Sequence, residues 1–535
     1  MTATTTSPLH GQQILRGGPT AGEAGSFDAA DARTGEALRG HSAASPAQAS
    51  AAVEAAAEAH RSYAAEPPER VAAFLEAAAD AIEALGDTLL EVGDRETALG
   101  VPRLTGERGR TCGQLRRFAG IARAQTWAEP TIDLARPDRA PLPKPDVRKL
   151  RRPLGPVAVF GASNFPLAFG VAGGDAAAAL AAGNAVVAKG HPAHPGVNEL
   201  VAGAVRSAAE ACGVDPGVFQ LVQGAEPALG QALVEHPLLE AVGFTGSQRV
   251  GRALMDLAAK RERPIPVYAE MGSTNPLFAL PAALEARGPA LAEGLAGSVL
   301  LGVGQFCTCP GVVAGVAGPA WNRFLEALGA ALAKPEPGVM LTPGIQKGLA
   351  DAVEKLRARG LVETLAGGPA PGGHARAGGT LLEADAEAYR SEPALREELF
   401  GPVILAVGCG DGAELRAVAA ATPGSLTATI HAEEADFGLA GELLRTLEPL
   451  AGRVVFNGFP TGVEVCAAMH HGGPYPSSSH PAATSVGDDA ISRFSRVVAY
   501  QGLPQGLLPP VLRDENPGKV WRRVDGELSD GPVRR

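Results

Sequence analysis

The middle of the chain alternates short apolar runs with longer alanine-rich segments. Apolar runs of strand length occupy residues 156–160, 185–188, 218–222, 241–244 and 266–269. Alanine-rich helical segments separate them, at residues 171–182, 196–212, 226–235 and 248–260. Alternation of strands and helices at this spacing predicts an α/β fold with a doubly wound, mostly parallel sheet.

Polar residues follow four of the five apolar runs. Asn164 comes after the first run, Lys189 after the second, Ser247 after the fourth and Glu270 after the fifth. Doubly wound sheets bind their ligands at the carboxyl ends of the strands. These four polar residues therefore lie where a ligand site is expected.

The region before this pattern is predicted to be largely helical. Ser45 has the position of an N-cap, with Pro46 at the first helical position and Gln48 three residues after the cap, so a helix is expected to run to about residue 64. Three more amphipathic helices are expected at residues 67–85, 87–100 and 107–126. Residues 1–24 are rich in Thr, Gly and Pro, and we expect them to form an arm or to be disordered.

A second pattern starts after residue 275. A helix over about 288–303 leads to Gln305 and Cys307, and another helix begins near Pro319. Two helical stretches alternate with three strand-like runs, at 345–359, 403–407, 412–421, 426–430 and 453–456. These elements predict a second α/β lobe.

The remaining segments surround the two lobes. Residues 130–153 hold many prolines and charges and indicate an extended excursion that pairs with another part of the fold or with another subunit. A strand-like run follows at 495–500, and the charged residues 511–535 are expected to form a tail.

The length of 535 residues and the net charge of -11 limit the classes of protein that fit. Chains above about 250–300 residues usually divide into domains, so two or three lobes are expected. The acidic balance argues against nucleic acid as a partner, and Gly, Pro or charge breaks each apolar stretch before the roughly 20 residues that a membrane span requires. The six cysteines are scattered without a CxxC spacing, which favours a reduced, cytoplasmic compartment.

Cys307 stands among small residues at 302–311, which let a substrate and a cofactor approach closely. A free thiol ionises near pH ~8.5, so a nucleophilic role needs positive or hydrogen-bonding surroundings, such as amides at a helix N-terminus. The alternative is a buried structural cysteine. Glu270 supplies a carboxylate in apolar surroundings and Asn164 a side-chain amide, so nucleophile, base and oxyanion donor are all present. The apolar setting predicts a pKa of Glu270 raised towards neutrality.

Gly246, Ser247 and Gly251 follow a strand and open a helix. This arrangement presents backbone amides and a hydroxyl to a pyrophosphate, although a simple helix cap has the same pattern. It is not the GxGxxG fingerprint of an ordinary Rossmann fold. Lys189, at a strand end, suits a ribose or a phosphate; the alternative is a solvated surface lysine.

Two further pairs of residues carry candidate chemistry. Glu398 suits a ribose diol and Phe400 suits packing against a nicotinamide, whereas the alternative is a helix end that leads into a strand. His470 and His471 could be taken for a metal pair. Adjacent residues seldom bind one ion, and no carboxylate or cysteine is spaced to complete a site, so no metal is expected.

Together these stretches resemble the aldehyde dehydrogenase superfamily from about residue 25 to residue 500. Four motifs are similar to the branch of 2,5-dioxovalerate (α-ketoglutaric semialdehyde) dehydrogenases: GASNFPLAF (161–169), KGHPAHP (189–195), GQFCTCPG (304–311) and HHGGPYPSS (470–478). The resemblance implies Cys307 as the nucleophile, Glu270 as the general base, and Asn164 with the Cys307 amide as the oxyanion hole. It implies cofactor contacts from Lys189, Ser247, Glu398 and Phe400.

The resemblance also implies an aldehyde dehydrogenase-like division of the chain. We expect a doubly wound cofactor domain (25–130 and 153–275) and an α/β catalytic domain (276–465). The other expected parts are an N-terminal arm (1–24), an oligomerisation element with the C-terminal return (131–152 and 466–510) and a tail (511–535). Association into homodimers or homotetramers is implied.

One departure from the superfamily pattern concerns the cofactor. Many NAD-preferring relatives have a Glu three residues after the lysine, where this chain has Pro192. Loss of that anion removes its repulsion of a 2′-phosphate, and His191, His194 and Lys189 add donors. NADP is therefore the expected cofactor, with NAD as the alternative.

The expected reaction oxidises an aldehyde to a carboxylic acid through a thiohemiacetal and a thioester on Cys307, with 2,5-dioxopentanoate giving 2-oxoglutarate. A long-chain or other aliphatic aldehyde is the second candidate, because Phe165, Phe169, Phe306 and Phe459 suit an apolar channel. A coenzyme A-acylating enzyme fits less well, since those relatives lack the Glu base. A catalytically silent protein on the same fold is the alternative of another class, and the intact catalytic residues count against it.

Overall fold

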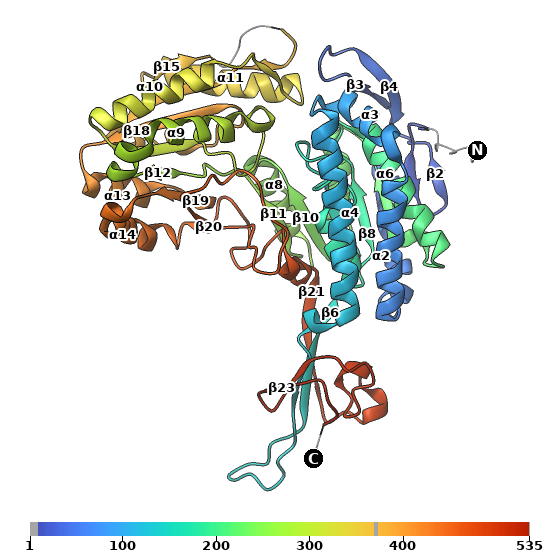
Figure 1. Ribbon diagram of the computed structural model, residues 1–535. Coiled ribbons are helices and arrows are strands. Elements are labelled where there is room, and N and C mark those ends of the chain that lie inside the picture. Colours follow the sequence, from blue (N-terminus) through green and yellow to red (C-terminus); the bar gives the residue numbers. More distant parts are fainter. Residues whose placement is uncertain (1–8, 369–372, 534–535) are drawn as a thin grey trace.

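The computed structural model describes residues 9–368 and 373–533. Figure 1 shows two α/β lobes, with the N-terminal half of the chain (blue to green) at the right and the next part (yellow to orange) at the upper left. A small β element projects below them and carries the C-terminal end. Among the described residues, no helix is long and apolar enough to cross a membrane.

The first lobe is built on a seven-stranded sheet. Its strands, in order across the sheet, are β11 (Val267–Glu270), β10 (Ala241–Thr245), β7 (Val157–Phe160), β8 (Val186–Lys189), β9 (Phe219–Val222), β1 (Gln13–Leu15) and β2 (Gly18–Thr20). The strands from β11 to β9 are parallel and begin and end within one residue of the predicted runs. Their carboxyl ends therefore lie along one edge of the sheet.

Helices cover both faces of this sheet, as the doubly wound prediction requires. They are α1 (Pro46–Tyr63), α2 (Pro68–Glu83), α3 (Gly86–Thr97), α4 (Val101–Ala124), α5 (Gly174–Ala181), α6 (Pro195–Ala211), α7 (Pro227–Glu235) and α8 (Gln248–Lys260). Alternate residues of β7 point to opposite faces, so Val157 and Val159 join the core with α2, α4, α5 and α6, and Ala158 joins the core with α1, α7 and α8. Ser45 and Gln48 form the predicted capping box of α1.

Two sequence predictions for this lobe need correction. Residues Gln13–Thr20, expected to belong to an arm, form the hairpin β1–β2, and Ile14 pairs with Leu221 and is buried. Two strands of three residues are too short to give a periodic signal. Helix α4 begins at Val101 rather than near residue 107, because Pro102 fits the first turn of a helix. A separate hairpin pairs β3 (Ser26–Ala30) with β4 (Ala37–Ser42).

The second lobe contains another seven-stranded sheet. Its order is β15 (Glu363–Gly367), β17 (Thr380–Asp385), β18 (Val403–Cys409), β13 (Val312–Val316), β12 (Leu277–Ala279), β19 (Ser425–His431) and β20 (Ala451–Phe456). All neighbours are parallel except β15 and β17. A short pair, β14 (Gly338–Val339) and β16 (Arg376–Ala377), lies apart from it.

Helices also cover both faces of the second sheet, which agrees with the predicted α/β lobe. They are α9 (Pro281–Leu300), α10 (Pro319–Ala333), α11 (Pro343–Ala358), α12 (Ala386–Ser391), α13 (Gly412–Ala421) and α14 (Phe437–Leu447). The helix expected from about 288 is the second part of α9, which has a non-helical backbone at Arg287 and a proline at Pro289.

The projecting element is a five-stranded sheet that joins distant parts of the chain. Its order is β21 (Ser495–Gln501), β6 (Val147–Pro153), β5 (Thr131–Asp133), β22 (Arg522–Val524) and β23 (Glu527–Ser529). The predicted excursion thus pairs with the strand near 495–500. The prediction of a tail was wrong for the described residues after 510. There Arg522 is buried and donates to the backbone carbonyls of Val511 and Asp514. Arginines that bind carbonyls inside a fold look in sequence like those of a solvated tail.

Candidate active site

Cys307 lies in the loop between α9 and β13, and the backbone before it is tightly folded. Gly302, Val303 and Gly304 have φ angles of 57°, 59° and 67°. A Cβ on Gly304 would lie 2.1 Å from the carbonyl carbon of Gly401, so only glycine fits this approach. The β-branched Val303 adopts a backbone conformation that costs of order 1–3 kcal/mol, and the surrounding structure must hold it.

Asn275 fixes the position of this loop. Its side-chain Nδ2 donates to the backbone oxygens of Cys307 at 2.8 Å and Cys309 at 2.9 Å. Its Oδ1 accepts from the backbone N–H of Thr427 at 3.2 Å. Asn275 is fully buried, so it ties the nucleophile loop to the second sheet. Sequence analysis assigned it no role.

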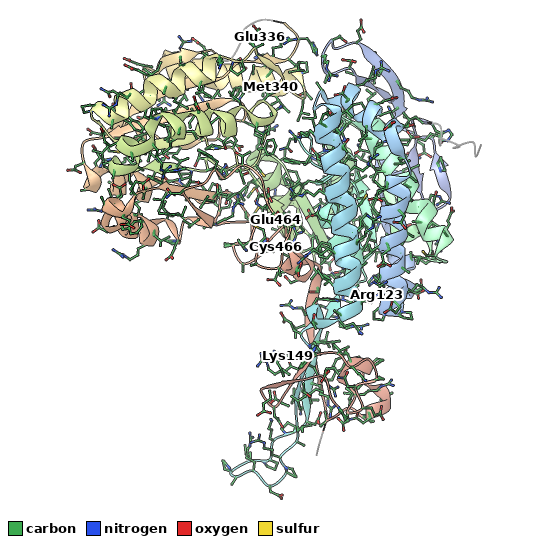
Figure 2. All side chains as sticks on the ribbon, in the orientation of Figure 1. Arg123, Lys149, Glu336, Met340, Glu464 and Cys466 are labelled. Carbon is green, nitrogen blue, oxygen red and sulfur yellow. The ribbon has the colours of Figure 1, made fainter. Side chains whose placement is uncertain are left out.

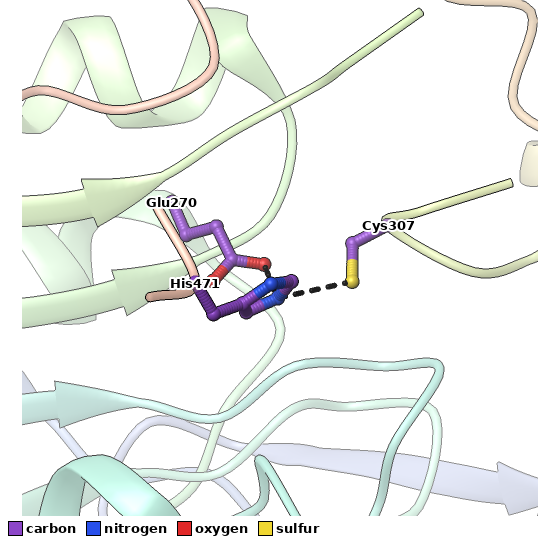
Figure 3. Close-up of side chains that lie close together, drawn as sticks. All are labelled: Glu270, Cys307 and His471. Carbon is purple, nitrogen blue, oxygen red and sulfur yellow. Dashed lines mark hydrogen bonds and ion pairs between the residues drawn. The ribbon is translucent and has the colours of Figure 1, made fainter. Parts of the chain in front are cut away.

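Glu270, His471 and Cys307 meet at the carboxyl end of β11 (Figure 3). Nε2 of His471 lies 3.4 Å from Sγ of Cys307 and 3.1 Å from Oε1 of Glu270. The hydroxyl of Ser485 donates to the other carboxylate oxygen of Glu270. The backbone N–H of His471 donates to Oγ1 of Thr484 at 2.8 Å. One ring nitrogen, Nε2, thus faces both the thiol and the carboxylate, so when it is unprotonated it can take the thiol proton and then pass it to Glu270.

The catalytic position of His471 was not predicted, because the sequence indicated this histidine only as half of a possible metal pair. The expectation that no carboxylate or cysteine could complete such a group was wrong, since ligand atoms of Glu270, Cys307 and His471 lie within 4.8 Å of one another. Cys307 and His471 are 164 positions apart in the chain, so no spacing rule finds them. The available signal was a histidine inside the motif at 470–478.

The electrostatic setting also corrects the expected pKa of Glu270. Burial raises this pKa, but His471 and the hydrogen bond from Ser485 together bring it below its ordinary value. Burial raises the pKa of Cys307 well above its ordinary value, Glu270 adds to the rise, and Arg110 opposes it. Cys307 also follows a helix instead of lying at a helix N-terminus, so the expected activation by such amides is absent from this described loop.

Hydrogen bonds hold Asn164 against the nucleophile loop. Its Nδ2 donates to the backbone oxygen of Gln305 at 2.9 Å, and its own backbone oxygen accepts from Arg103 at 2.6 Å. A side-chain amide has two N–H donors, so one remains for a ligand. Asn164 and Cys307 line the same cavity.

This cavity has a volume of about 840 Å³ and lies between the two lobes. Its wall contains most of the residues that the sequence singled out: Asn164, Lys189, Gly246, Ser247, Glu270, Cys307, Glu398 and Phe400. A cavity of this size with a few convergent polar groups is typical of a small-molecule or cofactor site. Strand ends of the first lobe and the loops before β13 and β18 of the second lobe therefore form one wall.

Gly251 is not part of this wall. It lies inside α8, where a Cβ would come within 2.7 Å of Sδ of Met271, so it allows the helix to pack closely on the sheet. Gly246 lines the cavity, but its N–H donates to the backbone oxygen of Glu270 at 3.1 Å. Ser247 is the N-cap of α8, which agrees with the interpretation of this stretch as a helix cap.

The charged residues of the wall suit a dinucleotide. Burial lowers the pKa of Lys189 to about 8 and raises the pKa of Glu398 to about 7. Oε1 of Glu398 accepts from the backbone N–H of Ser273 at 3.2 Å, which fixes the carboxyl group at the cavity. Arg249, which sequence analysis did not single out, adds a cation to the same wall.

The two histidines expected as phosphate donors differ. His191 lines the cavity, together with Pro192. His194 is fully buried, and its ring nitrogens lie 3.0 Å from the backbone oxygen of Ala162 and 3.2 Å from Oδ1 of Asn198. His194 therefore holds the fold together, and the expectation that it donates to a phosphate was wrong.

An aromatic cluster includes Phe306, the residue before Cys307. The rings of Phe165 and Phe306 lie 5.0 Å apart, and those of Phe165 and Phe169 lie 5.5 Å apart. Phe459, expected in the same apolar channel, packs against His431 in the second lobe with 5.1 Å between ring centres. Three of the four predicted aromatic residues therefore gather here.

Comparison with known proteins agrees with this geometry. The aldehyde dehydrogenase family matches residues 20–499. Alpha-ketoglutaric semialdehyde dehydrogenase 2 of Azospirillum brasilense is 51% identical over 446 residues, which cover 83% of this chain and 85% of the relative. Alpha-ketoglutaric semialdehyde dehydrogenase of Acinetobacter baylyi is 46% identical over 449 residues, which cover 84% of this chain and 85% of the relative.

The fold is shared with solved structures of the same kind. The crystal structure of the aldehyde dehydrogenase KauB from Pseudomonas aeruginosa matches with a TM-score of 0.79 over 92% of this chain and 97% of that chain, at 22% identity. The chain therefore belongs to the aldehyde dehydrogenase family and is an NAD(P)-dependent enzyme that oxidises aldehydes.

Proposed function

We propose that this enzyme oxidises 2,5-dioxopentanoate to 2-oxoglutarate, with NADP preferred, through a thioester on Cys307. The contact of His471 with Cys307 and Glu270, which are both part of the wall of the large cavity, carries the chemical part of this proposal. The names of the relatives at 51% and 46% identity support the substrate.

The first half of the reaction forms a bond between Sγ of Cys307 and the aldehyde carbon. Because burial keeps the thiol protonated at rest, its proton must leave as sulfur attacks, and Nε2 of His471 at 3.4 Å is placed to take it. The carbonyl oxygen becomes an oxyanion, which the free N–H of Asn164 and the backbone N–H of Cys307 stabilise. A donor of this type contributes about 3–4 kcal/mol to the barrier difference.

The second half turns the thiohemiacetal into a thioester and then into the acid. When bound, the nicotinamide ring supplies a hydride acceptor for the carbon attached to Cys307. Glu270, ionised at neutral pH because its pKa is lowered, takes a proton from water as the water oxygen attacks the thioester. The carbon–sulfur bond breaks and Cys307 leaves as thiolate, to which His471 can return a proton.

The cofactor part of the proposal is supported by the charges around Pro192. Pro192 and His191 line the cavity with Lys189 and Arg249, and no acidic side chain stands at position 192. Lys189, Ser247, Glu398 and Phe400 are the residues that would hold the dinucleotide. A 2′-phosphate near Lys189 and Arg249 would meet attractive charges.

An aliphatic aldehyde is the second candidate substrate. The aromatic cluster of Phe165, Phe169 and Phe306 favours it, since such rings bury an alkyl chain. The choice between an aliphatic aldehyde and an oxo acid depends on this aromatic cluster and on the charged side chains next to it.

We also infer that the enzyme forms homodimers or homotetramers through the projecting element, in the cytoplasm. Large apolar side chains on this element are exposed, with 73% of Leu507, 55% of Trp521 and 66% of Leu528 accessible. Large exposed apolar side chains on one small element favour a protein–protein contact. Sedimentation of the purified enzyme tests the inference, and a monomer at micromolar concentration would contradict it.

The decisive experiment measures initial rates of NADP and NAD reduction with 2,5-dioxopentanoate and with a medium-chain aliphatic aldehyde. The expected result is a higher kcat/KM for the oxo acid with NADP, and no turnover by Cys307→Ala. A higher kcat/KM for the aliphatic aldehyde would overturn the substrate, and a higher kcat/KM with NAD would overturn the cofactor preference.

A further inference from the structure

Arg110 leaves one edge of its guanidinium group free inside the protein. It lies in α4, and its Nε and one terminal nitrogen are both buried without a hydrogen-bond partner among the described residues. Burial lowers the pKa of Arg110, and the charge of the Cys307 thiolate is the largest effect that opposes this shift. A buried cation without partners is costly, so this edge calls for an anion.

Arg110 contacts the aromatic cluster next to Cys307. Cζ of Arg110 stands 5.4 Å from the ring centre of Phe169, whose ring centre is 6.2 Å from that of His471. The guanidinium thus lies over an aromatic ring, and its Nε and one terminal nitrogen remain without a partner among the described residues. Arg110 is therefore linked to the nucleophile through Phe169 and His471, whose Nε2 lies 3.4 Å from Sγ of Cys307.

The carboxylates near Arg110 are engaged elsewhere. Glu107 accepts from Nε of Arg103 at 3.1 Å and from the backbone N–H of Leu167 at 3.3 Å. Glu464 lies between α4 and the second lobe (Figure 2), is exposed, and accepts from the backbone N–H of Val465. Both acids influence the pKa of Arg110 without a hydrogen bond to it among the described contacts.

Two other arginines near the nucleophile have assigned structural partners. Arg103 donates to Glu107 and to the backbone oxygen of Asn164. Arg453 donates to the backbone oxygen of Gly462 at 3.2 Å and so holds the loop after β20. Arg110 differs from both because two nitrogens of the same edge, Nε and a terminal nitrogen, are unpartnered among the described residues.

We propose that Arg110 binds the carboxylate of the substrate aldehyde and thereby selects oxo acids over uncharged aldehydes. Two adjacent N–H groups of an arginine match the two oxygens of a carboxylate. In 2,5-dioxopentanoate the carboxylate carbon and the aldehyde carbon are about 5 Å apart, as four carbon–carbon bonds of ~1.5 Å allow. The aromatic cluster then covers the carbon chain between Arg110 and Cys307. This inference rests on the proposed function, whose substrate class it explains.

The test compares the wild-type enzyme with Arg110→Met, Arg110→Lys and a matched control, Arg117→Met. Arg117 lies two turns further along the same face of α4 and pairs with Asp488, with 3.0 Å between a terminal nitrogen and Oδ2. Each enzyme is assayed at saturating cofactor with 2,5-dioxopentanoate, 5-oxopentanoate and pentanal, which share a five-carbon chain and differ in the carboxylate and the keto group.

Arg110→Met is expected to lower kcat/KM for both carboxylated aldehydes about 10- to 100-fold, mainly through KM, which corresponds to a lost hydrogen bond between charged groups. Turnover of pentanal should change less than about twofold, Arg110→Lys should recover part of the loss, and Arg117→Met should behave as wild type. Glutarate, an unreactive five-carbon dicarboxylate, should inhibit pentanal oxidation by the wild type and lose potency in Arg110→Met.

Equal losses with all three aldehydes, or an unchanged KM for the carboxylated pair, would overturn the assignment. The proposed function can fail separately. If the wild type oxidises 5-oxopentanoate but not 2,5-dioxopentanoate, and Arg110→Met loses the former, the substrate falls and the role of Arg110 stands. If 2,5-dioxopentanoate is oxidised equally well by wild type and Arg110→Met, the substrate stands and the role of Arg110 falls.

Discussion

The two sides of Cys307 differ in how the chain builds them. On the proposed nucleotide side, Lys189 is the last residue of β8 and Ser247 follows β10, and both strands belong to the parallel part of one sheet. On the substrate side, Arg110 comes from the middle of α4 and His471 from the C-terminal return. The first side follows from a local rule of the fold, whereas the second depends on packing between distant segments. Changes on the substrate side should therefore alter proton transfer or selectivity and leave nucleotide binding intact.

The largest expected effect comes from Glu270→Gln. Gln keeps the shape of the side chain but cannot take a proton from water, so steady-state turnover should fall about 10³-fold. His471 still contacts Cys307 at 3.4 Å, so the first turnover should persist. Rapid-mixing measurements should then show a burst of reduced cofactor of about one equivalent per active site, followed by almost no further reaction.

A matched control for this prediction is Ser485→Ala, which removes one hydrogen bond from Glu270 and keeps the carboxylate. It should lower the steady-state rate far less. If Glu270→Gln abolishes the burst as well as the steady state, Glu270 is needed to form the thioester, and its role as base for water alone is rejected.

A smaller loss is expected for His471→Gln, which removes the imidazole that contacts both the thiol and the carboxylate. The rate of the first turnover, measured by rapid mixing, should fall about 10²-fold, because the thiol loses a group that takes its proton. His470→Gln is the matched control, since the neighbouring histidine makes no described contact with Cys307 or Glu270. Fluorescence titration with cofactor should give the same affinity for both variants and the wild type. Weaker cofactor binding in His471→Gln would contradict the independence of the two sides.

The same variant makes a prediction about pH. In the wild type the pKa of Glu270 is lowered, so its carboxylate remains ionised at neutral pH. The rate of thioester hydrolysis should therefore fall only when the pH drops below the ordinary carboxyl range. Without His471, burial is the largest remaining effect and raises this pKa. The acid limb of the hydrolysis rate should therefore move to higher pH in His471→Gln. An acid limb that stays in place would mean that His471 does not set the ionisation of Glu270.

Much of the fold was predictable because its signals are local. The runs that became β7 to β11 were found within one residue, and Ser45 was identified from a pattern of four residues. The hairpin β1–β2 was missed because each strand has three residues and gains its stability from pairing with β9. The strands after residue 510 were missed because Arg522 is buried by bonds to carbonyls that sequence does not reveal.

The site was predictable on the side where strands end. Cys307, Glu270 and Asn164 share one cavity, as the strand-end rule and the resemblance implied. The sequence offered no reason to assign a role to His471 or Arg110. A histidine in a loop and an arginine in a helix are common, and only the fold shows that these two lie near a thiol. The pKa of Glu270 was predicted in the wrong direction for the same reason, since burial was considered without its partner.

The smallest expected effect lies on the nucleotide side, with Pro192→Glu. Pro192 lines the cavity beside His191, and an anion there would repel a 2′-phosphate. The ratio of kcat/KM for NADP to that for NAD should fall about tenfold, or ~1.4 kcal/mol. Pro192→Gln, which changes the shape without the charge, should leave the ratio near that of wild type. The ratio of kcat/KM for 2,5-dioxopentanoate to that for pentanal should not change, because Arg110 is not among the described residues that line this cavity. If Pro192→Glu altered this aldehyde ratio as strongly as the cofactor ratio, the two sides would be coupled, and the nucleotide and substrate sites would have to be treated as one.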